Sequence, residues 1–333
     1  MKKLKLKAPP LALQAGYFVD QEYQNYNEMA ESSTGNWEYH CTYELRPNAL
    51  KGKHQILSLE NMLVSLGKRP GGMMHDVLSA EGSITLGVQH YLEDKATFDR
   101  MKLSHGDIIV FDDSTAYNYM TNKRVDLAVL TIRREAFGEL LPFFEAACLH
   151  KLVDTDGKLG TLLNKIWKDF TAPNPSTDFK KVEEEILSLL RIMSEEQTPQ
   201  VPLLSKGEEI AYAIRKQVYE HMDGNIQVSD LAAQYNISER GLQNSFKSLF
   251  GFTPKLFMRQ LKLNLVRHEL SHDVMKGTTV MRVAQKWGFA HMGRFSKFYT
   301  ELFEENPSET LNRSYDHTKA FTGKCVARQE EID

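Results

Sequence analysis

Two short stretches near the carboxyl end of the chain carry polar side chains suited to bonding the edges of DNA bases. In the first stretch, Ser238 begins a predicted helix whose apolar residues Leu242 and Phe246 repeat at four-residue spacing. The side chains that point away from this apolar side are Glu239, Arg240, Gln243, Asn244 and Lys247. Arginine can make two hydrogen bonds to guanine, and glutamine or asparagine can make two to adenine. The pattern predicts a helix with an exposed face that can read a major groove.

The second stretch repeats this arrangement further along the chain. Phe295 and Tyr299 form the apolar side of another predicted helix, which starts near His291. Its outward candidates are His291, Met292, Gly293, Arg294 and Lys297. Met292 can offer only apolar contact, for example to a thymine methyl group. We therefore expect the second helix to add more affinity than sequence specificity.

Each of these helices follows a short helix that ends at a residue tolerant of positive φ. That residue is Asn236 in the first copy and Gly288 in the second, and Ala232 or Ala284 lies four residues before it. Asn and Gly enter the left-handed region most easily, so the chain can turn sharply there. The small alanine lets the two helices cross closely. The shared spacing predicts two helix-turn-helix units.

The segment between the two units predicts one long helix, from about Pro254 to Ser271. Thr253 can cap its start, proline suits the first helical position, and apolar residues recur every fourth residue after it. Such a helix fixes the separation of the two units. The two reading helices should then lie about 34 Å apart, which is one turn of DNA.

The charge of this region differs from that of the whole chain. Between Arg240 and Lys297 there are eleven Lys or Arg residues and two acids, whereas the whole chain carries a net charge of −3. A local basic excess is typical of a surface that binds phosphates. Taken alone, the basic excess would be better explained by a solvated basic face.

Two helix-turn-helix units joined by a long helix resemble the DNA-binding domain of the AraC/XylS family of bacterial transcription regulators. The Gly288-Phe289 pair and the closing Phe303-x-x-x-Pro307 belong to the same resemblance, which covers about residues 205–311 and opens with a capping box at Ser205. The resemblance implies that the base-reading residues of the first helix are Arg240, Gln243 and Asn244. It also implies that Gly293 stands where a base-reading side chain is common.

A finer resemblance concerns two further stretches of sequence. Leu45-Arg-Pro-Asn-Ala-Leu-Lys-Gly and Trp287-Gly-Phe-Ala-His-Met-Gly-Arg-Phe are similar to stretches of ethanolamine-operon regulators. This similarity is too short to assign an effector.

The amino-terminal half has the pattern of short strands separated by turns. The predicted strands are 40–45, 55–59, 63–66, 84–89, 107–111 and 125–132. This spacing is typical of a sandwich or a small barrel. The stretch Gly106-Asp-Ile-Ile-Val-Phe resembles a strand of the cupin-like sensor that many AraC relatives carry. The expected fold is therefore α+β, with a cupin-like β-barrel or sandwich followed by helices and then an all-α DNA-binding domain.

No residue pattern in this half indicates catalysis. There is no His-x-His pair, no nucleophile signature and no Cys-x-x-Cys, and the three cysteines are widely spaced. We expect no enzymatic activity, no catalytic residue, no metal and no cofactor. A cavity for a small effector fits a small barrel better, although its residues stay unknown. Four aromatic residues are candidates to line it, or are simply core or surface: Tyr91, Phe98, Tyr117 and Tyr119.

Three helices are predicted between the strands and the basic region, over 136–150, 159–170 and 178–194. The last has apolar residues at alternating spacings of three and four: Phe179, Val182, Ile186, Leu189 and Met193. Such a seam can pair two copies of the chain or pack on its own barrel. The family resemblance favours a homodimer through this helix.

These patterns divide the chain into five segments. They are a flexible arm (1–38), a β-rich sensor (39–133), a helical dimerisation or linker segment (134–196), the DNA-binding domain (201–312) and a disordered tail (313–333). The resemblance implies a cytoplasmic transcription regulator, usually an activator, whose partners are promoter DNA, RNA polymerase and a small effector, with no membrane. Two alternatives stay open. One is an anti-activator that contacts another regulator, and the other is a small-molecule binding protein with a vestigial DNA domain.

Overall fold

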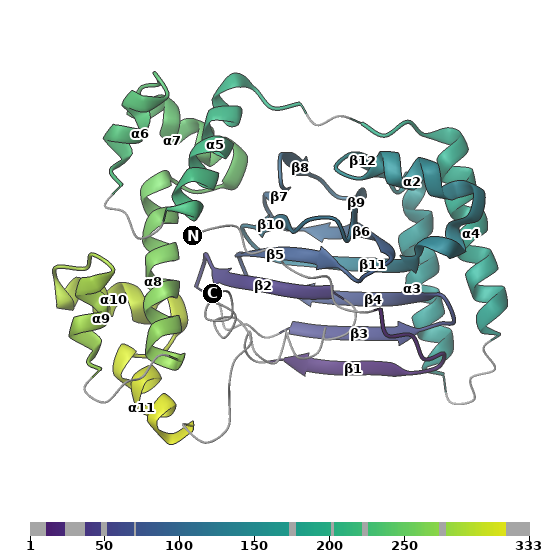
Figure 1. Ribbon diagram of the computed structural model, residues 1–333, viewed down its shortest axis with the longest axis horizontal. Coiled ribbons are helices and arrows are strands. Elements are labelled where there is room, and N and C mark those ends of the chain that lie inside the picture. The colour runs from purple at the N-terminus through teal and green to yellow at the C-terminus, as the bar shows by residue number, and fades with distance from the viewer. Residues whose placement is uncertain are drawn as a thin grey trace, which may run out of the picture.

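The two halves of the chain form a β-rich amino-terminal domain and a helical carboxyl-terminal domain that lie side by side (Figure 1). The structure is a computed structural model, and it describes residues 11–23, 37–47, 52–69, 71–172, 178–200, 203–221, 226–272 and 278–317. The disordered tail predicted after residue 312 lies outside these residues, apart from the end of the last helix. The greater part of the predicted arm lies outside them as well.

The amino-terminal domain is a sandwich of two antiparallel sheets. The first sheet has the order β1 (Phe18–Tyr23), β3 (Gly52–Ser58), β4 (Met62–Arg69), β11 (Val125–Arg133), β6 (Ser83–Leu92), β9 (Asp107–Asp112) and β12 (Lys151–Val153). The second has the order β2 (Trp37–Glu44), β5 (Met73–Ser79), β10 (Tyr117–Thr121), β7 (Ala96–Phe98) and β8 (Met101–Leu103). Both sheets are open, so the sandwich expectation is confirmed and the closed barrel is not formed.

The interior of the sandwich is filled by alternate residues of both sheets, because successive side chains of a strand point to opposite faces. Phe98 and Tyr117 of the five-stranded sheet stack with ring centroids 5.5 Å apart. Phe111 of the seven-stranded sheet lies 5.4 Å from Phe98. Three of the four aromatic candidates, Phe98, Tyr117 and Tyr119, therefore come together between the sheets, whereas Tyr91 is exposed.

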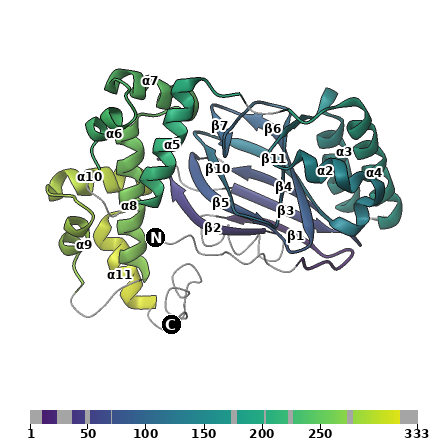
Figure 2. The ribbon, with the colours of Figure 1, turned by 45° about the horizontal axis from the view of Figure 1, so that its top comes forward.

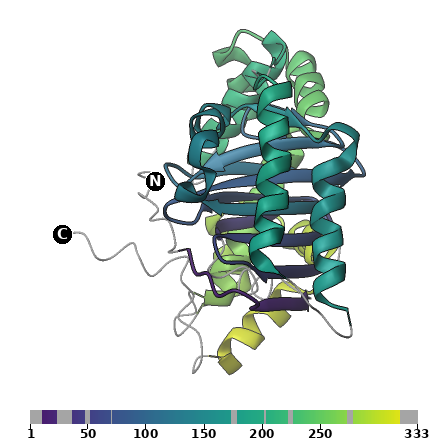
Figure 3. The same cartoon turned by 90° about the vertical axis from the view of Figure 1, so that its right-hand side faces the viewer.

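The other face of the seven-stranded sheet is covered by helices (Figure 2). These are the 3₁₀ helices η1 (Arg134–Leu140) and η2 (Thr155–Gly157) with α2 (Leu141–Ala147), α3 (Lys158–Phe170) and α4 (Phe179–Glu196). Figure 3 views this layer face-on, with two long helices crossing the strands. Ile186 and Met193 of α4 are buried in this core, and Phe179, Val182 and Leu189 pack against it. The predicted apolar seam thus packs on its own domain, which is the alternative to pairing two copies.

The carboxyl-terminal domain consists of seven helices in the described part of the chain. They are α5 (Lys206–Glu220), α6 (Val228–Gln234), α7 (Glu239–Phe250), α8 (Pro254–His272), α9 (Val280–Lys286), α10 (Met292–Phe303) and α11 (Pro307–His317). The capping box at Ser205 and Glu208 is formed, and α8 spans the predicted range and one residue more. The units α6–α7 and α9–α10 lie near opposite ends of α8 (Figure 1).

The two helix-turn-helix units relate differently to the sandwich. The core of the first unit includes Tyr43, Leu45, Met74 and Met120 from the outer face of the five-stranded sheet. The core of the second unit contains residues of α8 to α11 alone among the described residues. The first unit is therefore completed by the amino-terminal domain.

One segment of the predicted arm is ordered as a sheet edge. Phe18–Tyr23 forms β1, which pairs along its length with β3, and the side chain of Phe18 contacts the ring of Phe170 at a centroid distance of 5.4 Å. The prediction of a flexible arm is wrong for these residues. Six strands of the described sheets fall outside the predicted ones: β1, β5, β7, β8, β10 and β12.

Candidate nucleic-acid interface

The first helix-turn-helix unit has the turn that its sequence predicts. Asn236 has φ of +51°, and the backbone N–H of Ile237 donates to the carbonyl of Ala232 at 3.0 Å, which closes α6. The Ser238 hydroxyl then accepts from the backbone N–H of Gly241 at 3.1 Å and caps α7. Leu242 is fully buried beneath the helix. The opposite face of α7 is consequently left to solvent.

The second unit repeats these contacts. Gly288 has φ of +86°, and the N–H of Phe289 donates to the carbonyl of Ala284 at 2.9 Å. Phe295 and Tyr299 are fully buried on the inner side of α10. The recognition helices α7 and α10 are therefore held by matching turns, as the repeated spacing predicts.

Almost all of the candidate base-reading side chains are exposed to solvent. Seven of the eight are exposed: Arg240, Gln243, Asn244, Lys247, His291, Arg294 and Lys297. Met292 is partly buried, because it packs on the core of the second unit. Lys297 is paired with Glu301 at 3.8 Å, but its side chain is 73% exposed, so the pair is weak in water. Open space surrounds the position of a Cβ at Gly293.

Helix α8 sets the distance between the two units. Its 19 residues span about 28 Å at 1.5 Å per residue. Successive major grooves on one face of a duplex are about 34 Å apart. A rigid helix of this length is suited to placing two reading helices in adjacent grooves.

Not every cation of the basic segment is available to phosphates. Arg267 pairs with Glu44 and Glu305, Lys286 pairs with Glu269 at 2.9 Å, and the Arg259 guanidinium lies 4.0 Å from the centroid of the Phe298 ring. The charge count from sequence therefore overstates the cations that face solvent. Exposed Arg240, Lys247, Arg294 and Lys297 remain on the recognition helices.

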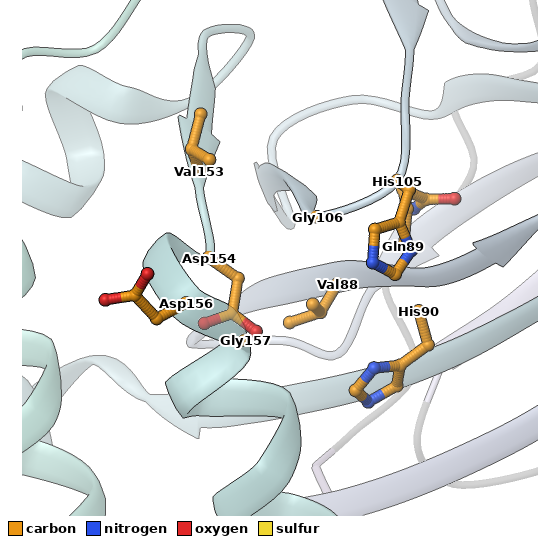
Figure 4. Close-up of a pocket in the computed structure, with 9 residues that line it drawn as sticks. All are labelled: Val88, Gln89, His90, His105, Gly106, Val153, Asp154, Asp156 and Gly157. Atoms are coloured by element: carbon orange, nitrogen blue, oxygen red, sulfur yellow. The ribbon is translucent and has the colours of Figure 1, made fainter.

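A cavity of about 360 Å³ opens beside β6 (Figure 4). Its lining residues are Val88, Gln89, His90, His105, Gly106, Val153, Asp154, Asp156 and Gly157. The Asp154 carboxylate already accepts from the backbone N–H groups of Leu159 and Gly160 at 2.8 and 2.9 Å. This carboxylate thus starts α3.

Among the described residues, no group of three or more His, Cys, Asp or Glu side chains is placed to hold a metal ion. His54 and His75 lie inside the sandwich, where burial lowers the pKa of His54 to about 4 and that of His75 well below its usual value. Both rings are therefore neutral at pH 7. No helix in the described ranges is long and apolar enough to cross a membrane.

Two helix-turn-helix units with exposed recognition helices, joined by one rigid helix, define a DNA-binding domain. Comparison with known proteins identifies its type. Residues 231–313 match the family model described as a helix-turn-helix domain. The XylDLEGF operon transcriptional activator of Pseudomonas putida is 32% identical over 111 residues, which are 33% of this chain and 35% of that protein. Regulatory protein HrpB of Ralstonia nicotianae is 33% identical over 103 residues, covering 29% of this chain and 22% of its own.

The AraC-like transcriptional activator CuxR aligns over 76% of this chain and 96% of its own, with 10% identity and a TM-score of 0.42. The chain spans about a third of the length of the first curated relatives it matches. The resemblance to the AraC/XylS family is confirmed for the carboxyl-terminal domain. The finer similarity to ethanolamine-operon regulators stays a prediction.

Proposed function

We propose that the protein is a sequence-specific DNA-binding transcription regulator, controlled by a small effector that binds the amino-terminal domain. The observation that carries the proposal is the position of the polar side chains of α7 and α10. They are exposed on two helices at opposite ends of α8, while the apolar sides of both helices are buried.

The two helices carry different side chains and are therefore proposed to make different contacts with DNA. Arg240, Gln243 and Asn244 of α7 can each make paired hydrogen bonds to a base edge. Helix α10 offers the cations Arg294 and Lys297, together with His291 and the apolar Met292. The first helix is proposed to supply most of the sequence specificity, and the second to supply contacts to phosphates.

The relatives support a role in activation. The Pseudomonas putida protein is named as a transcriptional activator of an operon. For this chain we propose activation of a nearby promoter in the cytoplasm through contact with RNA polymerase.

We further propose that the protein forms a homodimer. Since the apolar seam of α4 packs on its own sheet, such a dimer would use the outer face of α4, where Ile192 is 43% exposed. Sedimentation of the protein and of an Ile192→Glu variant would test that contact.

The domain boundaries proposed from sequence place the DNA-binding domain at 201–312 and a helical segment at 134–196. The capping box at Ser205 supports the first boundary. Residues 201 and 202 lie outside the described residues.

The test of the proposed function is selection of DNA by the full-length protein. Sheared genomic DNA is incubated with the protein at about 150 mM salt, and the retained fragments are sequenced. We expect enrichment of a few promoter fragments that share two boxes about 10 base pairs apart. Retention without sequence preference, at this salt and in the presence of added small metabolites, would refute a sequence-specific regulator.

A further inference from the structure

Helix α5 of the DNA-binding domain is held on the five-stranded sheet by polar contacts. Arg215 Nη1 donates to Oδ1 of Asn118 at 2.5 Å, and the Tyr219 hydroxyl donates to Oδ2 of Asp76 at 2.9 Å. Asn118 and Asp76 are cross-strand partners on β10 and β5, and Asn118 Nδ2 donates to Oδ1 of Asp76 at 2.7 Å. The four side chains form one connected network, which we call the α5 latch.

The Arg215–Asn118 contact of the latch is buried, whereas Asp76 and Tyr219 are partly exposed, so the buried contact constrains the helix most strongly. Arg215 is 4% exposed and Asn118 is 8% exposed. The carboxylate of Asp99 faces the same site, because it accepts from the backbone N–H of Asn118 at 3.3 Å and from the hydroxyl of Tyr212 at 3.4 Å. A buried guanidinium among hydrogen-bonded acceptors is expensive to displace, since moving it leaves charge without a partner.

The residue after Asn118 points to the other side of the same strand. Tyr119 lies inside the sandwich, where its hydroxyl donates to Oε1 of Gln89 on β6 at 2.8 Å. Its ring lies 5.3 Å from that of His75. Strand β10 is therefore the single layer of backbone between an interior hydrogen bond that joins the two sheets and the α5 latch.

Helix α5 is in turn packed on the first recognition helix. The Ser248 hydroxyl of α7 donates to Oε1 of Glu208 on α5 at 2.9 Å. Ile214 of α5 and Phe246 of α7 are fully buried in one core. A shift of α5 must displace α7, because close-packed side chains transmit strain.

We propose that strand β10 transmits the state of the sandwich interior to the first helix-turn-helix unit, through Tyr119 on one face and the Asn118–Arg215 contact on the other. A change inside the sandwich that breaks the Tyr119–Gln89 hydrogen bond moves β10 and loosens the latch. This inference deepens the proposed function and rests on it for the consequence at DNA. The coupling itself can be measured without DNA.

The experiment is amide hydrogen exchange of the full-length protein, followed over residues 206–220 of α5. Tyr119→Phe removes the interior hydroxyl and touches nothing in the latch. The matched control is Tyr23→Phe, because Tyr23 is equally buried in the same core, donates its hydroxyl to the carbonyl of Lys68 at 3.0 Å, and belongs to the other sheet. Gln89→Leu removes the same interior bond from β6 and serves as an independent second variant.

We expect Tyr119→Phe and Gln89→Leu to speed exchange in α5 about fivefold, the effect of losing one neutral hydrogen bond, and Tyr23→Phe to leave α5 unchanged. In an Arg215→Met background, Tyr119→Phe should add no further change. Equal effects of Tyr119→Phe and Tyr23→Phe, or no effect on α5, would overturn the coupling. Exchange that responds as expected in a protein that selects no DNA would leave the coupling intact and refute only the proposed function.

Discussion

Asn264 of α8 bonds both backbone groups of Glu44, the last residue of the edge strand β2. The Glu44 N–H donates to Oδ1 of Asn264 at 2.8 Å, and Nδ2 of Asn264 donates to the Glu44 carbonyl at 2.8 Å. A side-chain amide thus takes the place of the peptide group that a neighbouring strand would offer. Helix α8, between the two helix-turn-helix units, thus covers the end of this edge strand, where unpaired backbone groups could otherwise pair with another chain.

Asn264→Ala should destabilise the protein by about 2 kcal/mol, because it leaves two buried backbone groups without their partner. Urea unfolding of the full chain measures the change. Asn164→Ala is the matched control. Nδ2 of Asn264 and Nδ2 of Asn164 each donate to the carbonyl four residues earlier on their helices, at 2.8 Å, but Asn164 is exposed. Equal losses in the two variants would contradict a special role for Asn264.

Glu44 should make stability depend on pH near neutrality. Burial raises the pKa of Glu44 from 4.5 to about 7, against the opposing attraction of Arg267. The folded protein then holds a proton that the unfolded chain has released, so this contribution to stability is present below pH 4.5 and is lost as the pH rises through 7.

The Glu44→Gln variant should lack that slope, since its side chain cannot ionise. Arg267 keeps a partner in the variant, because its Nε lies 3.1 Å from Glu305. Free energies of unfolding of both proteins at several pH values from 4.5 to 8 give the difference directly. Parallel profiles over this range would show that Glu44 titrates at its ordinary pKa.

Gly251→Ala should destabilise the contact between the domains as well as the end of α7. Gly251 has φ of +80°, and a Cβ there would lie 2.5 Å from Nδ2 of Asn122. Asn122 is held in place by the Arg46 guanidinium, whose Nε donates to its Oδ1 at 2.8 Å. The strained φ costs about 1 kcal/mol and the overpacking adds roughly 1–2 kcal/mol.

Gly82→Ala separates the cost of the strained φ from the cost of overpacking. Gly82 has φ of +72°, and nothing lies within 4 Å of its Cβ position. Thermal unfolding should therefore show a smaller loss for Gly82→Ala than for Gly251→Ala. Identical losses would mean that Asn122 moves aside freely.

On the DNA itself, Gln243→Ala should weaken binding by roughly 1–3 kcal/mol and relax the preference at one base position. Lys297→Ala should weaken all sequences about equally and lower the dependence on salt, because it removes one phosphate contact. Lys168→Ala, on an exposed face of α3, is the control for net charge. Binding curves at several salt concentrations measure all three, and an unchanged site preference for Gln243→Ala would refute its assignment to a base.

The helices of the carboxyl-terminal domain could be predicted from the sequence far more completely than the strands of the sandwich. Its signals are local: Asn236 and Gly288 end helices, Ser238 caps the next one, and the repeat of Phe257 and Leu261 marks α8. Strands β5 and β10 carry no such signal. Their polar residues Asp76 and Asn118 alternate with apolar ones as though they faced water, whereas they face α5. Periodicity cannot show that a polar face is covered by another domain.

The exposure of the candidate base-reading residues could be predicted, because exposure on a helix follows from the spacing of its apolar residues. The ion pairs of Arg267 were not predicted, since Glu44 and Glu305 are distant in sequence and meet only in the folded chain. Likewise, the seam of α4 has the spacing of a pairing helix, but the sheet of its own domain supplies the partner.

The shared core of the first helix-turn-helix unit limits how this protein can evolve. Tyr43, Leu45, Met74 and Met120 belong to the amino-terminal domain in sequence but to the carboxyl-terminal domain in packing. A gene fusion that joined this carboxyl-terminal domain to an unrelated amino-terminal domain would expose the apolar surface that these four residues cover. The core of the second unit contains no residue of the amino-terminal domain among the described residues. Such a fusion would therefore destabilise α5 to α7 more than α9 and α10. The two domains must therefore be inherited together, or the four residues must be replaced by equivalent apolar residues in the new fusion partner.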